Sequence, residues 1–290
     1  MVAKKLDLLA IIGPTASGKT KLAIDIAKKY NGEIIAADSR TIYKHLDIGT
    51  AKPDEKEQDG IVHWGLNLVG PGQKFTVSDY KIYADLTIQS IKDRNKLPII
   101  VGGSGLYVDS VLYNFSLAPA KEELRKRLEK LDVEHLQIKL LKKGLKMPIN
   151  KLNKRHLIRV IERGNFELSR EPLNKNYLII GISPTRVELE DRITERANLM
   201  LKSGVLKEII KVSKLYGWDS EAMTGGIYRV FRDVLNGDKS EDQALVDFIR
   251  SDLKLAKKQM TWFKRNSDIH WFKDTSSALT WFDKTFSGKL

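Results

Sequence analysis

The sequence predicts an α/β protein in which helices flank a parallel sheet. Four short apolar runs are typical of buried parallel strands, and they lie at residues 8–12, 33–37, 97–101 and 177–182. Between and after these runs, apolar residues recur at the spacing of amphipathic helices. Buried strands that alternate with such helices are typical of this architecture.

The segment LLAIIGPTASGKT, at residues 8–20, joins the first strand to the first helix. Gly13 to Thr20 match the phosphate-loop pattern G-x-x-x-x-G-K-[ST], whose backbone N–H groups and helix N-terminus face an anion. The ammonium of Lys19 would lie beside this anion, and the Thr20 hydroxyl would be placed to bind Mg²⁺. The pattern predicts a P-loop NTPase-like core, but the anion could belong to a nucleotide or to another diphosphate. A glycine-rich turn without a ligand is the alternative.

The chain carries a large excess of positive charge. It has 50 Lys and Arg against 37 Asp and Glu, which gives a formal net charge of +13. A diphosphate pocket needs only a few cations, so we expect a polyanion such as RNA as a partner. A generally basic, lysine-rich proteome would explain the same excess.

Composition also limits the compartment and the chemistry. The chain contains no cysteine, which excludes disulfides, thiol catalysis and Cys-ligated zinc. No apolar run approaches the roughly 20 residues of a membrane span, and the N-terminus carries no secretory apolar region. We therefore expect a cytoplasmic protein that does not associate with membranes.

The second predicted strand ends at Asp38 and Ser39. Ligands of open α/β sheets bind at the carboxyl ends of the strands, so Asp38 should lie beside the phosphate loop. This position favours a general base or a carboxylate near the metal, although a helix or turn cap is equally consistent with it. The third strand ends at Gly102, where a motor ATPase would have an aspartate, and this weakens an ATPase interpretation.

Residues 43–77 are dense in glycine, proline and polar side chains and predict a long loop. A loop of this length inside a compact domain is usually functional. Ser78 is the expected N-cap of the helix that follows it.

The composition changes at Ala118. Residues 121–143 and 154–168 predict two amphipathic helices with basic surfaces, which predicts a small all-helical domain over residues 118–172. The core domain would then comprise residues 1–117 and 173–290. The basic helices could contact a phosphate backbone, and solvated amphipathic helices are the alternative.

Two further helices are predicted near the C-terminus. One spans residues 187–201 and carries arginines four residues apart, at Arg192 and Arg196. The other spans residues 247–264, with a largely outward basic face that could line an RNA cleft. Its aromatic residues, Trp262 among them, are expected in the core rather than as base-stacking platforms.

These motifs together resemble one family, the tRNA dimethylallyltransferases. GPTASGKT at Gly13, D-S-x-x-x-Y at Asp38, DIGTAKP at Asp47 and G-G-[ST]-G-L-Y at Gly102 are similar to its signatures and occur in its order, and AKKQMTWF at Ala256 resembles its AKRQ-x-TWF block. The resemblance spans nearly the whole chain. It implies transfer of a dimethylallyl group from dimethylallyl diphosphate to the exocyclic amine of the adenosine 3′ of the anticodon in tRNA. The partners would be the anticodon stem-loop and the donor, and the cofactor Mg²⁺.

The resemblance also implies roles for individual residues. The exocyclic amine is a weak nucleophile and needs a base within hydrogen-bond reach, a role that falls to Asp38. Lys19 and Thr20 would assist catalysis, with Thr20 also holding the metal. The implied diphosphate-binding residues are Gly13, Thr15, Ala16, Ser17, Gly18, Lys19, Thr20, Arg192 and Arg196. The implied tRNA-binding residues are Asp38, Ser39, Arg40, Thr41, Ser104, Arg125, Arg155, His156, Arg159, Lys257 and Lys258. Arg192 and Arg196 could instead pair with nearby glutamates on the helix surface.

The sequence departs from the family pattern at four places. Thr41 replaces a glutamine that reads the adenine, His156 replaces an arginine, residues 225–228 replace A-I-G-Y, and residues 252–253 replace Thr-Arg. We expect these changes to remove RNA or donor contacts, so tRNA specificity would be reduced or shifted while the chemistry remains. The Cys/His zinc finger of eukaryotic members is absent, so a bacterial-type, monomeric enzyme is expected.

Three other functions remain open on the sequence. An adenylate isopentenyltransferase would act on free nucleotides but needs neither the basic insertion nor the surplus charge. A P-loop small-molecule kinase would not explain DIGTAKP or KKQMTWF. A non-catalytic RNA-binding relative would explain the four departures.

Overall fold

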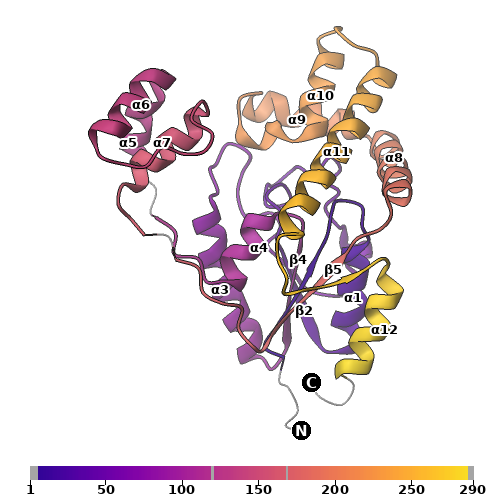
Figure 1. The fold of residues 1–290 in the computed structure, drawn as a ribbon. Coiled ribbons are helices and arrows are strands. Elements are labelled where there is room, and N and C mark those ends of the chain that lie inside the picture. Colours follow the sequence, from indigo (N-terminus) through magenta and orange to yellow (C-terminus); the bar gives the residue numbers. More distant parts are fainter. Residues whose placement is uncertain (1–5, 119–120, 168, 287–290) are drawn as a thin grey trace. The chain divides into compact units, whose positions relative to one another are not determined.

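The computed structural model describes residues 6–118, 121–167 and 169–286. Within these ranges, six strands form one sheet in the order β3-β2-β4-β1-β5-β6, and all neighbouring strands are parallel (Figure 1). The strands are β1 (Leu8–Ile12), β2 (Gly32–Ala36), β3 (His63–Trp64), β4 (Leu97–Gly102), β5 (Tyr177–Ile182) and β6 (Ile269–Phe272). The predicted parallel α/β fold is confirmed. Strands β3 and β6 have no signal in the sequence, because both are short edge strands without a continuous apolar run.

Helices cover both faces of this sheet (Figure 1). Helices α1 and α12 lie on one face, where Leu22 and Phe282 pack in one buried cluster with Leu9 and Ile11 of β1. Helices α3 and α4 lie on the other face. Their bounds are α1 (Lys19–Lys29), α3 (Val77–Asp93), α4 (Gly105–Leu112) and α12 (Thr275–Phe286), and the short α2 (Glu55–Gln58) lies in the loop after β2.

Helix α3 begins earlier than the sequence predicted. Its N-cap is Thr76 rather than Ser78, because Thr76 and Asp79 form a reciprocal capping box. The backbone N–H of Thr76 donates to Asp79 Oδ2 at 2.8 Å, and the N–H of Asp79 donates to Thr76 Oγ1 at 3.3 Å. The signal was present in the sequence as T-x-x-D, one turn before an apolar run.

A layer of helices follows β5 and packs on the segment after β2. Ile42, Tyr43 and Leu46 of that segment share one buried cluster with Ile209 and Phe231 of these helices. The helices are α8 (Arg186–Lys202), α9 (Val205–Tyr216), the 3₁₀ turn η1 (Glu221–Thr224), α10 (Gly226–Leu235) and α11 (Glu241–Phe263). Helix α11 begins at its Ser240 cap, two turns before the predicted start at residue 247.

The chain divides into two compact units. The first comprises Met1–Leu112 and Leu173–Leu290, and the second comprises Tyr113–Pro172. The predicted boundary at residue 118 lies inside the second unit, where Ala118 is buried and its carbonyl accepts a hydrogen bond from Arg159. Residue 168, where the second predicted helix of this domain ends, lies outside the described ranges.

Helices make up the regular structure of the second unit, as far as its described residues show. They are α5 (Glu122–Glu129), α6 (Val133–Lys142) and α7 (Lys154–Arg163), and they bury one cluster formed by Leu128, Leu136, Leu140, Leu157, Ile158 and Ile161. The single helix predicted for residues 121–143 is wrong. The side chain of Asp132 caps a new helix by accepting from the N–H of His135 at 2.8 Å.

A buried carboxylate fastens α5 to α7. Glu162 is fully buried, and Arg125 binds both of its oxygens, with Nε at 2.7 Å and Nη2 at 2.6 Å. Arg159 approaches the same carboxylate at 3.5 Å. Two arginines that the resemblance assigned to tRNA are therefore also structural, because a buried carboxylate requires a charged partner.

We expect Glu162→Ala to destabilise the second unit by about 3 kcal/mol, because it leaves the guanidinium of Arg125 without its buried partner. The measurement is native-state hydrogen exchange of the amides in α5 and α7. Glu123→Ala is the matched control, since Glu123 forms an exposed ion pair with Lys126 and its loss should cost less than about 1 kcal/mol. Equal effects of the two substitutions would contradict the structural role of Glu162.

Candidate active site

The phosphate loop connects β1 to α1 and is held in an open turn. Ala16 and Gly18 have φ of 59° and 87°, the left-handed conformation that favours glycine and is strained for alanine. Ser17 is buried, and its hydroxyl has no hydrogen-bond partner. The ammonium of Lys19 donates to the carbonyl of Pro14 at 3.1 Å. The loop therefore presents a hydroxyl and an ammonium group that an anion could bind.

The carboxyl ends of β1, β4 and β2 bring Asp38 close to this loop. Strand β4 lies between the other two, and a Cβ on Gly102 at its end would lie 2.0 Å from the carbonyl oxygen of Ala37. Only glycine allows so close an approach. The hydroxyl of Ser104 then accepts from the N–H of Ser39 at 3.0 Å, and the carboxylate of Asp38 accepts from the N–H of Arg40 at 2.8 Å.

A cavity of about 220 Å³ opens beside the phosphate loop, and we call it the loop pocket. Its lining contains both polar and apolar residues. The polar lining comprises residues 15–20, Asp38, Thr41, Thr50, His63 and Arg196, and the remaining lining comprises Ile34, Ala36, Ala51, Pro53, Leu66, Val101 and Gly102. Such a cavity suits a ligand with an anionic end and a small apolar end.

A second cavity, of about 470 Å³, lies next to the loop pocket, and we call it the α10–α11 pocket. Its lining includes Ser39, Arg40, Ser104, Lys258 and residues 224–230. Four residues line both cavities, namely Thr15, Asp38, Thr50 and Arg196. The Asp38 carboxylate is therefore positioned where ligands in the two cavities would meet.

Arg192 and Arg196 of α8 lie beside the phosphate loop. Arg192 donates to the carbonyl of Ser17 at 3.4 Å, and Arg196 lines both pockets. Arg196 forms an ion pair with Asp252 of α11, whereas its Nε is buried without a partner. Burial raises the pKa of Asp252, and the charge of Arg196 opposes this shift. The departure from the family pattern at Asp252 thus gives Arg196 a partner, which the sequence did not predict.

The ammonium of Lys19 has a lowered pKa. Its pKa is lowered to about 8, mainly because the group is removed from water; the Asp38 carboxylate opposes this shift, and the charge of Arg196 adds a smaller lowering. A lysine with this pKa loses its charge in mildly alkaline solution. A bound diphosphate would restore the charged form, because an adjacent anion favours it.

Gln259 is a site residue that the sequence analysis missed. Its side-chain carbonyl accepts from the N–H of Thr15 at 2.9 Å, which ties α11 to the phosphate loop. A Cβ on Gly103 would lie 2.3 Å from Gln259, and a Cβ on Gly105 would lie 2.3 Å from Trp262. The G-G-S-G motif therefore makes room for the KKQMTWF motif, and the two motifs form one contact. Trp262 is 39 % exposed, so its predicted place in the core is wrong.

The remaining predicted residues lie outside the two pockets. Gly13 is buried beneath the loop, and a Cβ there would lie 2.6 Å from the carbonyl oxygen of Ile182. Lys257 lies on an exposed face of α11, in a shallow cavity that it shares with Lys258 and Trp262. In the second unit, Arg155 and His156 are exposed on the first turn of α7.

Within the described part of the chain, no group of three or more His, Cys, Asp or Glu side chains could hold a metal ion. Phosphate-bound Mg²⁺ typically takes several oxygens from its ligand and from water and few from the protein. The Thr20 hydroxyl, which lines the loop pocket, fits such a protein ligand. No described helix is long and apolar enough to cross a membrane.

The fold and the site define a phosphate-loop protein with two neighbouring pockets. Asp38 is the carboxylate among the residues that line both pockets. Family models described as IPP transferase and isopentenyl transferase match residues 41–266 and 6–66. The chain belongs to the IPP transferase family, and the resemblance seen in the motifs is confirmed.

Several known proteins are similar to the chain over most of their length. The tRNA dimethylallyltransferase of Acetivibrio thermocellus is 41% identical over 285 residues, which cover 91% of each chain. That of Staphylococcus aureus is 35% identical and covers 96% of each chain. The solved tRNA isopentenylpyrophosphate transferase of Bacillus halodurans is 33% identical, with a TM-score of 0.74 over 99% of this chain and 96% of that one. A eukaryotic dimethylallyltransferase acting on tRNA, 22% identical with a TM-score of 0.77 over 97% of this chain and 77% of that one, shares the fold.

The low pKa of Lys19 predicts that diphosphate binding weakens at alkaline pH. The terminal phosphate of a diphosphate monoester has lost its last proton well below pH 8, so Lys19 is the group expected to change charge. We expect the Kd for methyl diphosphate to rise about fivefold between pH 8 and pH 9. Calorimetry measures it, and the weaker binding of Lys19→Met should show no such rise. An affinity that stays constant from pH 7 to 9.5 would contradict the assignment.

Proposed function

We propose that this protein transfers a dimethylallyl group from dimethylallyl diphosphate to the exocyclic amine of the adenosine 3′ of the anticodon in tRNA. The products are N6-isopentenyladenosine and diphosphate. The proposal rests on the observation that Asp38 lines both the loop pocket and the α10–α11 pocket. The names of the related proteins support tRNA, rather than a free nucleotide, as the acceptor.

The loop pocket suits the donor. The phosphate loop would bind the diphosphate through its N–H groups, the Ser17 hydroxyl and the Lys19 ammonium. The apolar lining residues, which include Ile34 and Leu66, would hold the dimethylallyl group and exclude water from it. The Thr20 hydroxyl would hold Mg²⁺, which would supply neutralisation of the charge on the leaving group.

The α10–α11 pocket suits the acceptor. Its volume of about 470 Å³ is sufficient for an adenine that has left the anticodon-loop stack. Ser39, Arg40 and Ser104 line it and would bind the target nucleotide. Thr41, which replaces the family's glutamine, is 6 % exposed and lines the loop pocket instead, so the adenine would lose that contact.

The transfer step requires few groups. The nitrogen of the exocyclic amine attacks the allylic carbon, the carbon–oxygen bond to the diphosphate breaks, and Asp38 accepts the proton that the amine loses. Negative charge develops on the bridging oxygen of the diphosphate as it leaves. Lys19 and the loop N–H groups are placed to stabilise that charge.

The rest of the tRNA would bind through the basic surfaces. Arg155, His156 and Arg159 of α7 and Arg125 of α5 would contact its phosphates, as would Lys257 and Lys258 of α11. Arg155 and His156 are exposed and make no side-chain contact that the described residues reveal, so they are the most available of this set. We propose that the protein acts as a monomer in the cytoplasm.

Asp38→Asn should abolish transfer while leaving both substrates bound. The amide cannot accept the proton, and we expect kcat to fall by about 10²- to 10⁴-fold. Label transfer from dimethylallyl diphosphate to tRNA measures turnover, and filter binding measures the Kd for tRNA, which should change only a few-fold. Asp191→Asn, on the exposed face of α8, is the matched control and should retain turnover. Near-normal turnover of the Asp38 variant would remove this carboxylate from the mechanism.

Arg155→Ala should weaken tRNA binding in a salt-dependent way. Loss of one phosphate contact reduces the slope of log K against log salt by about one. Lys284→Ala, at an exposed lysine of α12, is the control and should leave the slope unchanged. If the two variants give the same slope, α7 does not contact phosphate.

A further inference from the structure

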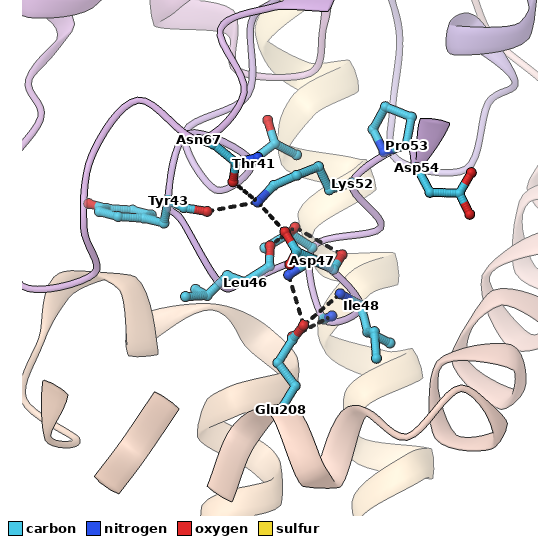
Figure 2. A network of polar contacts seen from close by, with 12 residues as sticks. Thr41, Tyr43, Leu46, Asp47, Ile48, Lys52, Pro53, Asp54, Asn67 and Glu208 are labelled. Carbon is cyan, nitrogen blue, oxygen red and sulfur yellow. Dashed lines mark hydrogen bonds and ion pairs between the residues drawn. The ribbon is translucent and has the colours of Figure 1, made fainter. Parts of the chain in front are cut away.

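The charged residues of the DIGTAKP motif, Asp47 and Lys52, bind each other. The ammonium of Lys52 donates to the carbonyl of Tyr43 at 2.8 Å, to Asp47 Oδ1 at 2.6 Å and to Asn67 Oδ1 at 2.7 Å (Figure 2). The side chain of Lys52 is only 4 % exposed. This lysine fixes the inner side of the loop formed by residues 46–53, which we call the DIGTAKP loop.

The outer side of the DIGTAKP loop is held by one carboxylate of α9. Glu208 Oε2 accepts from the backbone N–H groups of Asp47 and Ile48, both at 2.8 Å, and Oε1 accepts from that of Gly49 at 2.9 Å (Figure 2). The hydroxyl of Tyr228, on α10, donates to the same Oε1 at 2.7 Å. Four donors thus converge on two oxygens, and hydrogen bonds to a charged acceptor are the strong ones.

Close packing makes this arrangement specific. A Cβ on Gly49 would lie 2.6 Å from the Tyr228 hydroxyl, so only glycine lets the loop approach both α9 and α10. Thr50 also donates to the carbonyl of Leu46 at 2.6 Å, which closes the turn. The path of the DIGTAKP loop is therefore set from outside by Glu208 and Tyr228.

Residues of the DIGTAKP loop also line the two pockets. Thr50, Ala51 and Pro53 line the loop pocket, and Gly49 and Thr50 line the α10–α11 pocket. Glu208 lines neither pocket. A side chain outside both pockets therefore determines where their shared wall lies.

We propose that Glu208 is a positioning residue that sets the donor pocket through the DIGTAKP loop. The identity of the donor rests on the proposed function. Ala51 and Pro53 are apolar lining residues of the loop pocket, whereas the candidate anion-binding residues of that pocket belong to the phosphate loop. Because Glu208 binds the backbone of the DIGTAKP loop, it controls recognition of the alkyl part of the donor and leaves recognition of the diphosphate unchanged.

Glu208→Gln tests this assignment, because the amide keeps the size of the side chain but replaces one acceptor oxygen with an NH₂ group that opposes the donors. We expect the KM for dimethylallyl diphosphate to rise about tenfold, with kcat falling less than threefold. The Kd for inorganic diphosphate should stay within twofold. Amide exchange within residues 46–53 should accelerate at least tenfold.

Two further variants keep the test decisive. Tyr228→Phe removes one of the four donors and should accelerate exchange in the DIGTAKP loop less than Glu208→Gln does. Glu190→Gln, at an exposed glutamate of α8, is the matched control and should change no readout. If Glu208→Gln leaves the exchange of residues 46–53 unchanged, the assignment is overturned.

A purely structural role for Glu208 gives a different result. In that case diphosphate binding, kcat and thermal stability would fall together with donor affinity, and the positioning role would be overturned. The exchange and diphosphate measurements require no transfer. If the wild-type protein transferred no dimethylallyl group, the proposed function would fail, while selective loosening of the DIGTAKP loop in Glu208→Gln would still support the positioning role.

Discussion

The site depends on the close approach of three strand ends at the carboxyl edge of the sheet. Glycines at the end of β4 leave no side chain between the phosphate loop, which follows β1, and Asp38, which follows β2. A Cβ on Gly102 would lie 2.0 Å from a carbonyl oxygen, so this spacing cannot be kept with any other residue. The distance between an anion on the loop and a base at Asp38 is thus a property of the backbone, which a packed sheet holds firmly.

Helices that come later in the chain complete the two pockets. Gln259 of α11 accepts from the phosphate loop, Arg196 of α8 lies between the pockets, and Glu208 of α9 holds the DIGTAKP loop. None of these residues acts through a local contact. Gln259 and Glu208 each join a helix after β5 to a segment before β3, and Arg196 pairs with Asp252 of α11. The helical layer therefore acts on the same loops that the sheet positions, and this explains why motifs far apart in the sequence belong to one site.

The sequence predicted what is encoded locally. The strands with continuous apolar runs, the phosphate loop and the place of Asp38 followed from residues that are neighbours in the chain. Gln259 and Glu208 could not be found in this way, because their partners Thr15 and Ile48 are 244 and 160 residues away. The ion pair of Asp252 with Arg196 was missed for the same reason. The break in the helix predicted for residues 121–143 depends on the Asp132 cap rather than on periodicity, and the short edge strands lack a continuous apolar run.

The most direct test of the account supplies the purified protein with labelled dimethylallyl diphosphate, magnesium and either tRNA or AMP, with labelled ATP as a control donor. Mass spectrometry of nuclease fragments then locates the label. The account predicts one dimethylallyl group on the adenosine 3′ of the anticodon and none on AMP. Label on AMP alone, or phosphate transfer from ATP without prenylation of tRNA, would contradict it.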